Sequence, residues 1–134
     1  MNGTLNRIIL SNRFRVACLV TGAGLAAWLF IGAAPSAQPQ WFREPFDKLL
    51  HFIYFATIAA LFAHGSGAKR FWLPLILVPL IGALDEWHQM SVPGRYASVW
   101  DWSADLAGSL TAMYVYWRWH PYITSMQNTQ GGVP

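Results

Sequence analysis

The sequence predicts an all-α membrane protein built as a bundle of four transmembrane helices. The chain has 134 residues, of which 54% are hydrophobic and 11% charged, whereas soluble domains carry about 25% charged residues. It also contains eight tryptophans, a residue type that gathers at membrane interfaces. One span of the hydrocarbon core takes about 20 residues, so the length allows four spans and leaves no room for a large soluble domain.

The same composition excludes several classes of protein. Disordered chains combine low hydrophobicity with high charge, which is the opposite of this composition. The nine lysines and arginines form no dense run, so we expect no nucleic-acid partner. Cys18 is the single cysteine, which rules out an intrachain disulfide framework and a metal site built from several cysteines.

Four apolar segments account for the predicted spans, at residues 16–34, 49–63, 71 to about 90 and about 99 to 119. The first holds nineteen residues without a charge, which is longer than the apolar core of about 7–15 residues in a signal peptide. Pro35 also interrupts the small-residue pattern of a cleavage site. We therefore expect an uncleaved helix there. The other three segments are interrupted near one end by acidic residues and histidines.

The distribution of lysine and arginine predicts that both termini lie in the cytoplasm. With the N-terminus inside, the inner segments carry six basic residues and the outer segments three, and an inner excess is the rule. The inner residues are Arg7, Arg13, Arg15, Lys69, Arg70 and Arg118, and the outer ones are Arg43, Lys48 and Arg95. The chain then divides into a basic cytoplasmic N-terminus (1–15), a four-helix transmembrane domain (16–120) and a flexible cytoplasmic tail (121–134).

In this arrangement every acidic residue falls on the outer side, together with two of the histidines. These residues are Glu44, Asp47, Asp85, Glu86, Asp101, Asp105, His51 and His88. Charged side chains at membrane depth are costly and face a bundle interior or a water-filled cavity. The pattern therefore predicts a polar pocket, open to the outside, between the second, third and fourth helices. The first helix has no ionisable residue in its core, and we expect it to be a buttress.

The polar groups fall on two levels if each residue adds about 1.5 Å along a helix. The lower level, about 20–22 Å above the inner edge, contains His51, Asp85 and Asp105. The upper level, about one turn higher, contains Asp47, His88, Gln89 and Asp101. Within each helix the members are three or four residues apart, so they share one helix face.

A loop and two glycines shape the predicted pocket. Pro93 and Gly94 favour a turn that returns Arg95 toward the carboxylates. Gly82 and Gly108 allow the backbones to approach closely beneath the pocket. Pro79 is expected to kink the third helix, and Trp102, with other tryptophans, to mark the outer membrane interface.

Three motifs follow one another along the chain: Asp47-Lys48-x-x-His51, then Asp85-Glu86-x-His88-Gln89 with Pro93-Gly94-Arg95, then Ser98-x-x-Asp101-x-x-x-Asp105-x-x-Gly108. Through them, over about residues 46–112, the chain resembles the VanZ-like family of bacterial membrane proteins. The resemblance implies a multi-pass protein of the bacterial cytoplasmic membrane that acts in the cell envelope. The family's namesake is associated with resistance to the glycopeptide antibiotic teicoplanin. Asp105 departs from the family pattern, which often has asparagine there, and adds a charge.

The pocket residues suit several kinds of chemistry. Their oxygen and nitrogen atoms could hold a divalent metal ion such as zinc or manganese, or form a hydrogen-bonded cluster without a metal. For general acid–base catalysis, the candidate catalytic residues are His51, Asp85, Glu86, His88, Asp101 and Asp105. The candidate substrate-binding residues are Asp47, Lys48, Tyr54, Gln89, Arg95 and Ser98, and the arginine suits a phosphate or carboxylate.

We therefore predict an envelope protein of the lipid bilayer whose outward-facing pocket recognises a lipid-linked or cell-wall precursor, with a link to glycopeptide resistance. Two alternatives stay open. The first is a membrane-embedded hydrolase or transferase acting on such a precursor, although no known nucleophile or phosphate-loop motif occurs in the sequence. The second is a proton-coupled transporter, which the lack of ionisable residues in the predicted inner half disfavours.

Overall fold

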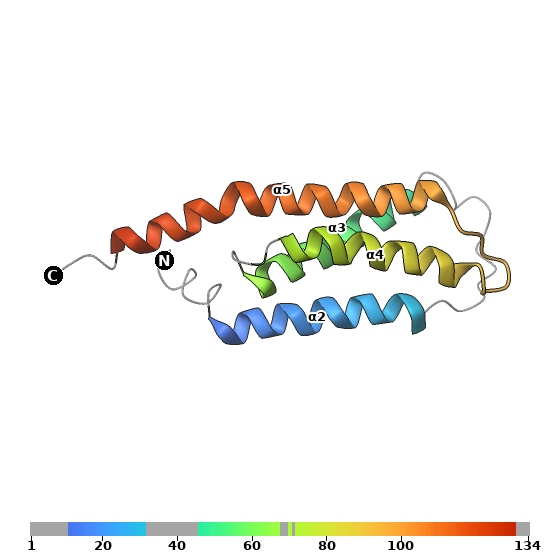
Figure 1. Ribbon diagram of the computed structural model, residues 1–134, viewed down its shortest axis with the longest axis horizontal. Coiled ribbons are helices and arrows are strands. Elements are labelled where there is room, and N and C mark those ends of the chain that lie inside the picture. Colours follow the sequence, from blue (N-terminus) through green and yellow to red (C-terminus); the bar gives the residue numbers. More distant parts are fainter. Residues whose placement is uncertain (1–10, 32–45, 68–69, 71, 131–134) are drawn as a thin grey trace.

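The computed structural model describes residues 11–31, 46–67, 70 and 72–130, and for residues 121–130 it describes only the helical backbone. The described part contains four helices: α2 (Asn12–Ile31), α3 (Phe46–Ser66), α4 (Trp72–Gln89) and α5 (Val99–Gln130). They run alternately up and down, so the start of α2 and the end of α5 lie at the same end of the bundle (Figure 1). This confirms the predicted all-α architecture with four helices.

The helices follow the four predicted segments, with one difference near the C-terminus. α5 continues to Gln130, so residues 121–130 are helical where the sequence suggested a flexible tail. Beyond Pro121, no glycine or proline occurs before Gly131, so this stretch contains no helix breaker. Residues 1–10, 32–45, 68–69, 71 and 131–134, which the predicted segments and domains include, lie outside the described residues.

Two turns depend on a glycine with a positive φ angle. α3 ends where Gly67, at φ 75°, donates its N–H to the carbonyl of Ala63 at 3.2 Å. In the α4–α5 loop, the N–H of Arg95 donates to the carbonyl of Val92 at 3.1 Å, with Gly94 at φ 83°. This is the glycine position of a type II turn. The predicted turn before Arg95 is thereby confirmed.

α3 is the central helix and packs against α2, α4 and α5. The buried apolar core consists of Phe55, Ile58, Ala59 and Val78. Gly108 brings α5 onto α3, because a Cβ at this position would collide with the backbone carbonyl of Phe52. The close backbone approach predicted at this glycine is therefore confirmed. It sets which residues of α5 lie opposite which residues of α3.

The bundle exposes apolar side chains and buries polar ones, the reverse of a soluble protein. Ile31 on α2, Ile76 on α4 and Tyr114 on α5 are 77%, 60% and 62% exposed. The buried polar residues are Asp85, Glu86, Gln89, Asp101, Asp105 and Ser109. α2 and α3 are each long and apolar enough to cross a membrane. This distribution is the one expected of helices that face lipid and enclose a polar interior.

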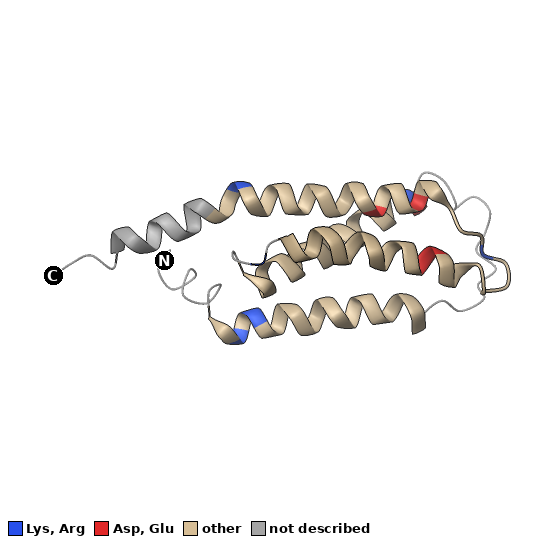
Figure 2. Ribbon diagram, in the orientation of Figure 1, with Lys and Arg blue, Asp and Glu red and all other residues tan. Residues whose placement is uncertain are grey.

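The described acidic residues gather at one end of the bundle, where α4 passes into α5 (Figure 2). Here α3 begins with Asp47, α4 ends shortly after Asp85 and Glu86, and α5 begins with Asp101 and Asp105 in its first two turns. We call this the acidic end. The opposite end holds the start of α2, the end of α3 and the start of α4. Glu44, Arg43 and Trp41 lie outside the described residues.

Candidate functional site

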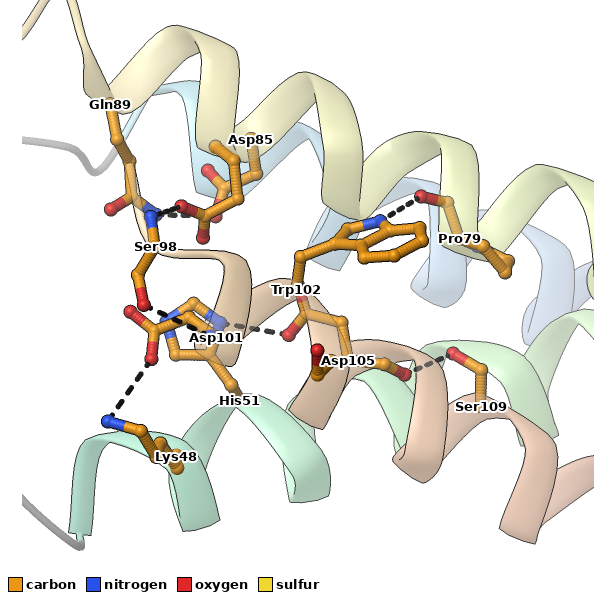
Figure 3. Close-up of polar contacts among 12 residues, drawn as sticks. Lys48, His51, Pro79, Asp85, Gln89, Ser98, Asp101, Trp102, Asp105 and Ser109 are labelled. Atoms are coloured by element: carbon orange, nitrogen blue, oxygen red, sulfur yellow. Dashed lines mark hydrogen bonds and ion pairs between the residues drawn. The ribbon is translucent and has the colours of Figure 1, made fainter. Parts of the chain in front are cut away.

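Three helices supply the polar side chains that meet at the acidic end (Figure 3). They are Asp47, Lys48 and His51 of α3, Asp85, Glu86 and Gln89 of α4, and Asp101 and Asp105 of α5. Spacings of three or four residues keep the members from one helix on one face. The buried members of α5, Asp101 and Asp105, therefore continue down the same face to Ser109, which is also buried.

A hydrogen-bonded pair, His51 and Asp105, links α3 to α5 in this cluster. Nδ1 of His51 lies 2.9 Å from Oδ1 of Asp105, and the aspartate side chain is fully buried. In neutral histidine this contact places the hydrogen on Nδ1 and leaves Nε2 as an acceptor. Burial of a carboxylate is costly unless it is paired, so each side chain stabilises the other in place.

The second oxygen of Asp105 lies against α4 at Gly82. An added Cβ on Gly82 would lie 2.9 Å from this oxygen, Oδ2, and 3.3 Å from the ring of Phe55. At this glycine the neighbouring atoms belong to side chains and not, as predicted, to another backbone, and the missing Cβ makes room for the carboxylate. Oδ2 is buried and accepts no hydrogen bond from the described residues, so Asp105 keeps unused acceptor capacity.

The start of α5 is tied to the end of α4 through Ser98. Its backbone N–H donates to Oε2 of Glu86 at 2.6 Å, and its hydroxyl accepts from the N–H of Asp101 at 3.3 Å. The hydroxyl is therefore used as a helix N-cap, although the sequence suggested Ser98 for substrate binding. Oε1 of Glu86 is buried and has no hydrogen-bond partner within the described part of the chain.

Two further side-chain contacts complete the cluster. Nζ of Lys48 lies 3.7 Å from Oδ1 of Asp101. Nε2 of Gln89 donates to Oδ2 of Asp85 at 2.9 Å, one helical turn away. The lysine and the amide thus hold a carboxylate each and do not point freely into solvent.

His88 and Tyr54 lie on the side of the cluster that faces α2. The ring of His88 packs edge-on against Phe30, with 5.5 Å between ring centroids, and the hydroxyl of Tyr54 donates to the carbonyl of Leu25 at 2.7 Å. On a helix, the fourth residue after Asp85 is turned about 40° one way and the third about 60° the other way. Gln89 therefore joins Asp85, and His88 turns toward α2 instead of meeting the carboxylates.

A partly open cavity of about 560 Å³ lies beside the cluster. Its polar lining residues are Asp47, His51, Tyr54, Thr57, Asp85, Gln89 and Arg95. Its apolar lining residues are Leu25, Trp28, Leu29, Leu50, Ile53 and Phe55. The volume falls in the range of about 300–1,000 Å³ that is typical of small-molecule sites. The lining from α2 is apolar, the lining from α4 and the α4–α5 loop is polar, and α3 contributes residues of both kinds.

The apolar wall from α2 was not predicted, because the first helix was expected to be a buttress only. The signal was present in the spacing of Leu25, Trp28 and Leu29, which share one helix face. Trp102, which the sequence places at the outer membrane interface, also makes a contact that was not predicted. Its indole N–H donates to the carbonyl of Pro79 at 3.1 Å, so it joins α5 to α4.

Two groups of side chains have the composition of a metal site. One ligand atom each from His51, Asp85 and Glu86 lies within 4.8 Å of the others, and the same holds for Asp47, His51 and Asp101. The histidine is common to both groups. The cluster as a whole offers carboxylate oxygens in excess of donors, so its chemistry suits a cation or the hydroxyl and amide groups of a polar ligand.

Comparison with protein families gives a match over most of the chain. A family model described as VanZ/LLP1 matches residues 7–120, which include α2, α3, α4 and α5 as far as His120. No curated protein and no solved structure matches the chain.

Proposed function

Because the chain belongs to the VanZ/LLP1 family, we propose that it recognises a lipid-linked or cell-wall precursor in the cavity at its acidic end. The observation that carries this proposal is the two-sided lining of that cavity, which is polar toward α4 and apolar toward α2. A precursor that joins a hydrocarbon chain to a polar head presents the same two surfaces. Such a ligand would place its head among the carboxylates and its chain along α2 and α3.

The proposal includes a bacterial cytoplasmic membrane protein with four spans and the acidic end outside. The exposed apolar residues of α4 and α5, such as Leu80, Leu84 and Leu110, support spans for these helices as well as for α2 and α3. The excess of lysine and arginine in the inner segments supports an inner location for residues 1–15 and for those beyond 120. The acidic end then faces the compartment in which cell-wall precursors are used.

Arg95 is the residue proposed to hold an anionic group of the ligand. It is half-buried and lines the cavity, and its guanidinium makes no hydrogen bond or ion pair with other described residues. A guanidinium binds a phosphate or carboxylate through two parallel hydrogen bonds. Trp28, 64% exposed on the cavity wall, offers an apolar face on the other side.

Binding to the purified protein in lipid nanodiscs tests the proposal. The probe is a polyprenyl-diphosphate-linked cell-wall sugar, followed by native mass spectrometry. Arg95→Ala is expected to weaken binding by about tenfold or more, because hydrogen bonds to charged groups contribute about 1.5–3 kcal/mol. Arg13→Ala is the matched control, since Arg13 is exposed at the opposite end. Equal affinity of the three proteins, or no binding by the unmodified one, would contradict the proposal.

The link to glycopeptide resistance is tested in cells. Production of the protein in a teicoplanin-susceptible bacterium is expected to raise the inhibitory concentration of teicoplanin, and Arg95→Ala is expected to remove that effect at equal expression. If the Arg95→Ala variant still confers resistance, the resistance does not depend on ligand binding in the cavity.

A second candidate, a hydrolase or transferase acting on the same precursor, is favoured by the His51–Asp105 pair. A carboxylate that orients a histidine leaves the other ring nitrogen able to act as a general base. Mass spectrometry of the precursor after incubation separates the two functions. A change of mass that needs His51 indicates an enzyme, whereas binding with unchanged mass indicates recognition alone.

A further inference from the structure

We propose that His51, Asp85 and Glu86 bind one divalent transition-metal ion, with zinc as the ion to test first and Asp105 as a positioning residue. The proposal is independent of precursor recognition, because it concerns a site that the protein would hold without any precursor. It adds a metal centre at the boundary between the acidic cluster and the cavity.

The first argument is the geometry of the three side chains. One ligand atom from each lies within 4.8 Å of the others. Ligands bound tetrahedrally to zinc at about 2.1 Å lie about 3.4 Å apart, so small side-chain rotations close the site. Two carboxylates and one imidazole form a set that zinc and manganese accept. His51 belongs to α3 and the two carboxylates belong to α4, so all three ligands are held by helices, which are rigid elements.

The second argument is the orientation of His51. Its Nδ1 is held by Oδ1 of Asp105 at 2.9 Å, so Nε2 is the nitrogen left to bind an ion. A histidine that donates one ring N–H to a carboxylate and binds metal through the other nitrogen is the usual arrangement in metal sites. Asp105 is fully buried, so water does not compete with it for the Nδ1–H of His51.

The third argument is an unpaired atom that is independent of the clustering. Glu86 is 7% exposed, and its Oε2 accepts from the backbone of Ser98 at 2.6 Å. Its Oε1 is buried and has no hydrogen-bond partner among the residues that the structure describes. Burial of an unpaired carboxylate oxygen is costly, and a bound cation would offset that cost.

Charge balance favours the same site over the second group of side chains. Five described carboxylates share the acidic end with Lys48 and Arg95, and Lys48 already lies 3.7 Å from Asp101. Asp101, a member of the second group, therefore has a cation, whereas Glu86 has none within the described contacts. A divalent ion at Glu86 would place positive charge beside a carboxylate that has no cationic partner among the described residues.

The site would remain open to ligands. His51 and Asp85 line the cavity, so an ion between them would face it. Three protein ligands leave a tetrahedral ion one position for water or a ligand atom, as in catalytic zinc sites. Gln89 binds only Oδ2 of Asp85, which leaves Oδ1 for the ion.

Metal titration of the purified full-length protein in nanodiscs tests the proposal without any precursor. After removal of metals with a chelator, Zn²⁺ alone is added and bound metal is counted by elemental analysis and calorimetry. About one ion per chain is expected. Glu86→Gln is expected to weaken the affinity at least tenfold, whereas Asp101→Asn, the matched carboxylate-to-amide control, leaves it nearly unchanged. Thermal unfolding of each variant establishes that it is folded.

The positioning role of Asp105 has its own readout. Asp105→Asn is expected to weaken metal binding by about 10- to 100-fold and to shift the visible absorption spectrum of bound Co²⁺, which a purely structural change would leave in place. The proposal is overturned if the folded protein binds no stoichiometric metal. It is also overturned if Asp101→Asn removes binding while Glu86→Gln retains it. Neither result decides the precursor-binding experiment, because that experiment is made without added metal.

Discussion

The two ends of the bundle use their polar side chains in different ways. At the opposite end, Arg15 of α2 donates from Nε to the carbonyl of Gly65 at 3.2 Å and from Nη2 to that of Ser66 at 3.1 Å. These are carbonyls of the last turn of α3, which an α-helix leaves without partners. His64 packs edge-on against Phe14 and Tyr116. The polar groups at this end thus serve to close the bundle.

The acidic end leaves its polar groups incompletely used. Three buried side-chain atoms lack a hydrogen-bond partner among the described residues, namely Glu86 Oε1, His88 Nδ1 and Asp105 Oδ2, and a fourth, Asp101 Oδ1, has only the ion-pair contact with Lys48 at 3.7 Å. All four lie at the acidic end. Buried polar atoms are normally paired in folded proteins, so unpaired ones need an explanation. The difference between the ends suggests that one end maintains the fold and the other is kept ready for a ligand.

The largest expected effect of a single change at the acidic end comes from His51→Ala. It leaves the carboxylate of Asp105 buried without its hydrogen-bond partner, and leaving a buried polar group unsatisfied costs about 1–3 kcal/mol, and more for a charged group. Thermal unfolding of the detergent-solubilised protein measures the loss. The added change Asp105→Leu is expected to recover much of the stability without restoring precursor binding. Recovery of both would show that the pair has only a structural role.

His64→Ala is the matched histidine at the opposite end. It loses ring contacts with Phe14 and Tyr116, each of which is worth about 0.5–1.5 kcal/mol, and precursor binding is expected to stay intact. If this variant is folded to the same extent but loses precursor binding, the opposite end also takes part in binding, which contradicts the proposed difference between the two ends.

Gly108→Ala is expected to have the next largest effect. The new Cβ would meet the backbone of Phe52, which cannot rotate away, and overpacking costs about 1–3 kcal/mol. The change should also separate His51 from Asp105 by moving α5 off α3, so binding and stability fall together. Gly24→Ala is the control, because nothing lies within 4 Å of its Cβ position. Equal unfolding temperatures of the two variants would contradict the close contact.

Arg15→Ala is expected to lower stability by about 1–3 kcal/mol, because two part-buried hydrogen bonds to the end of α3 are lost and each is worth about 0.5–1.5 kcal/mol. Precursor affinity should not change, since the arginine is at the opposite end. Arg13→Ala, two residues away and exposed, serves as control in the same unfolding experiment. An affinity that drops with Arg15→Ala would mean that the two ends are coupled.

The smallest effect is expected from Ser98→Ala. The change removes the hydroxyl that accepts from the N–H of Asp101, and loss of an N-cap costs about 1 kcal/mol, but the backbone contact with Glu86 stays. Precursor affinity should fall less than twofold, in contrast to Arg95→Ala. Ser103→Ala, whose hydroxyl bonds only within α5, is the control. A large loss of affinity with Ser98→Ala, but not with Ser103→Ala, would show that the Ser98 hydroxyl contacts the ligand, as the sequence analysis suggested.

Much of the fold followed from the sequence because the helices coincide with apolar segments. The spacing of Asp47 and His51, and of Asp101 and Asp105, also placed them on shared helix faces. Their convergence with Asp85 was therefore predictable from helical rise and the need to bury charge. The extension of α5 to Gln130 was missed, since a polar composition was interpreted as a tail although no breaker follows Pro121 before Gly131.

The direction in which individual side chains turn could not be predicted from the sequence. Gln89 and His88 both lie close to the face of Asp85, and only the position of α2 decides that His88 packs against Phe30. In the same way, only the packing of α5 against α4 places the indole N–H of Trp102 on the backbone carbonyl of Pro79. The orientation of these side chains depends on how the helices pack against one another. The hydrophobic periodicity of a single segment carries no information about that packing.

The claim that the acidic end is the ligand site is tested most directly by photo-crosslinking in membranes. A polyprenyl-linked precursor with a photoreactive group on its hydrocarbon chain is irradiated with the protein, and the labelled residues are identified by mass spectrometry. We expect label on the cavity wall, at Leu25, Trp28 and Leu29 of α2 and at Leu50 and Ile53 of α3, with a loss of label in Arg95→Ala. Label at the opposite end, or equal label in the Arg95→Ala variant, would contradict the account.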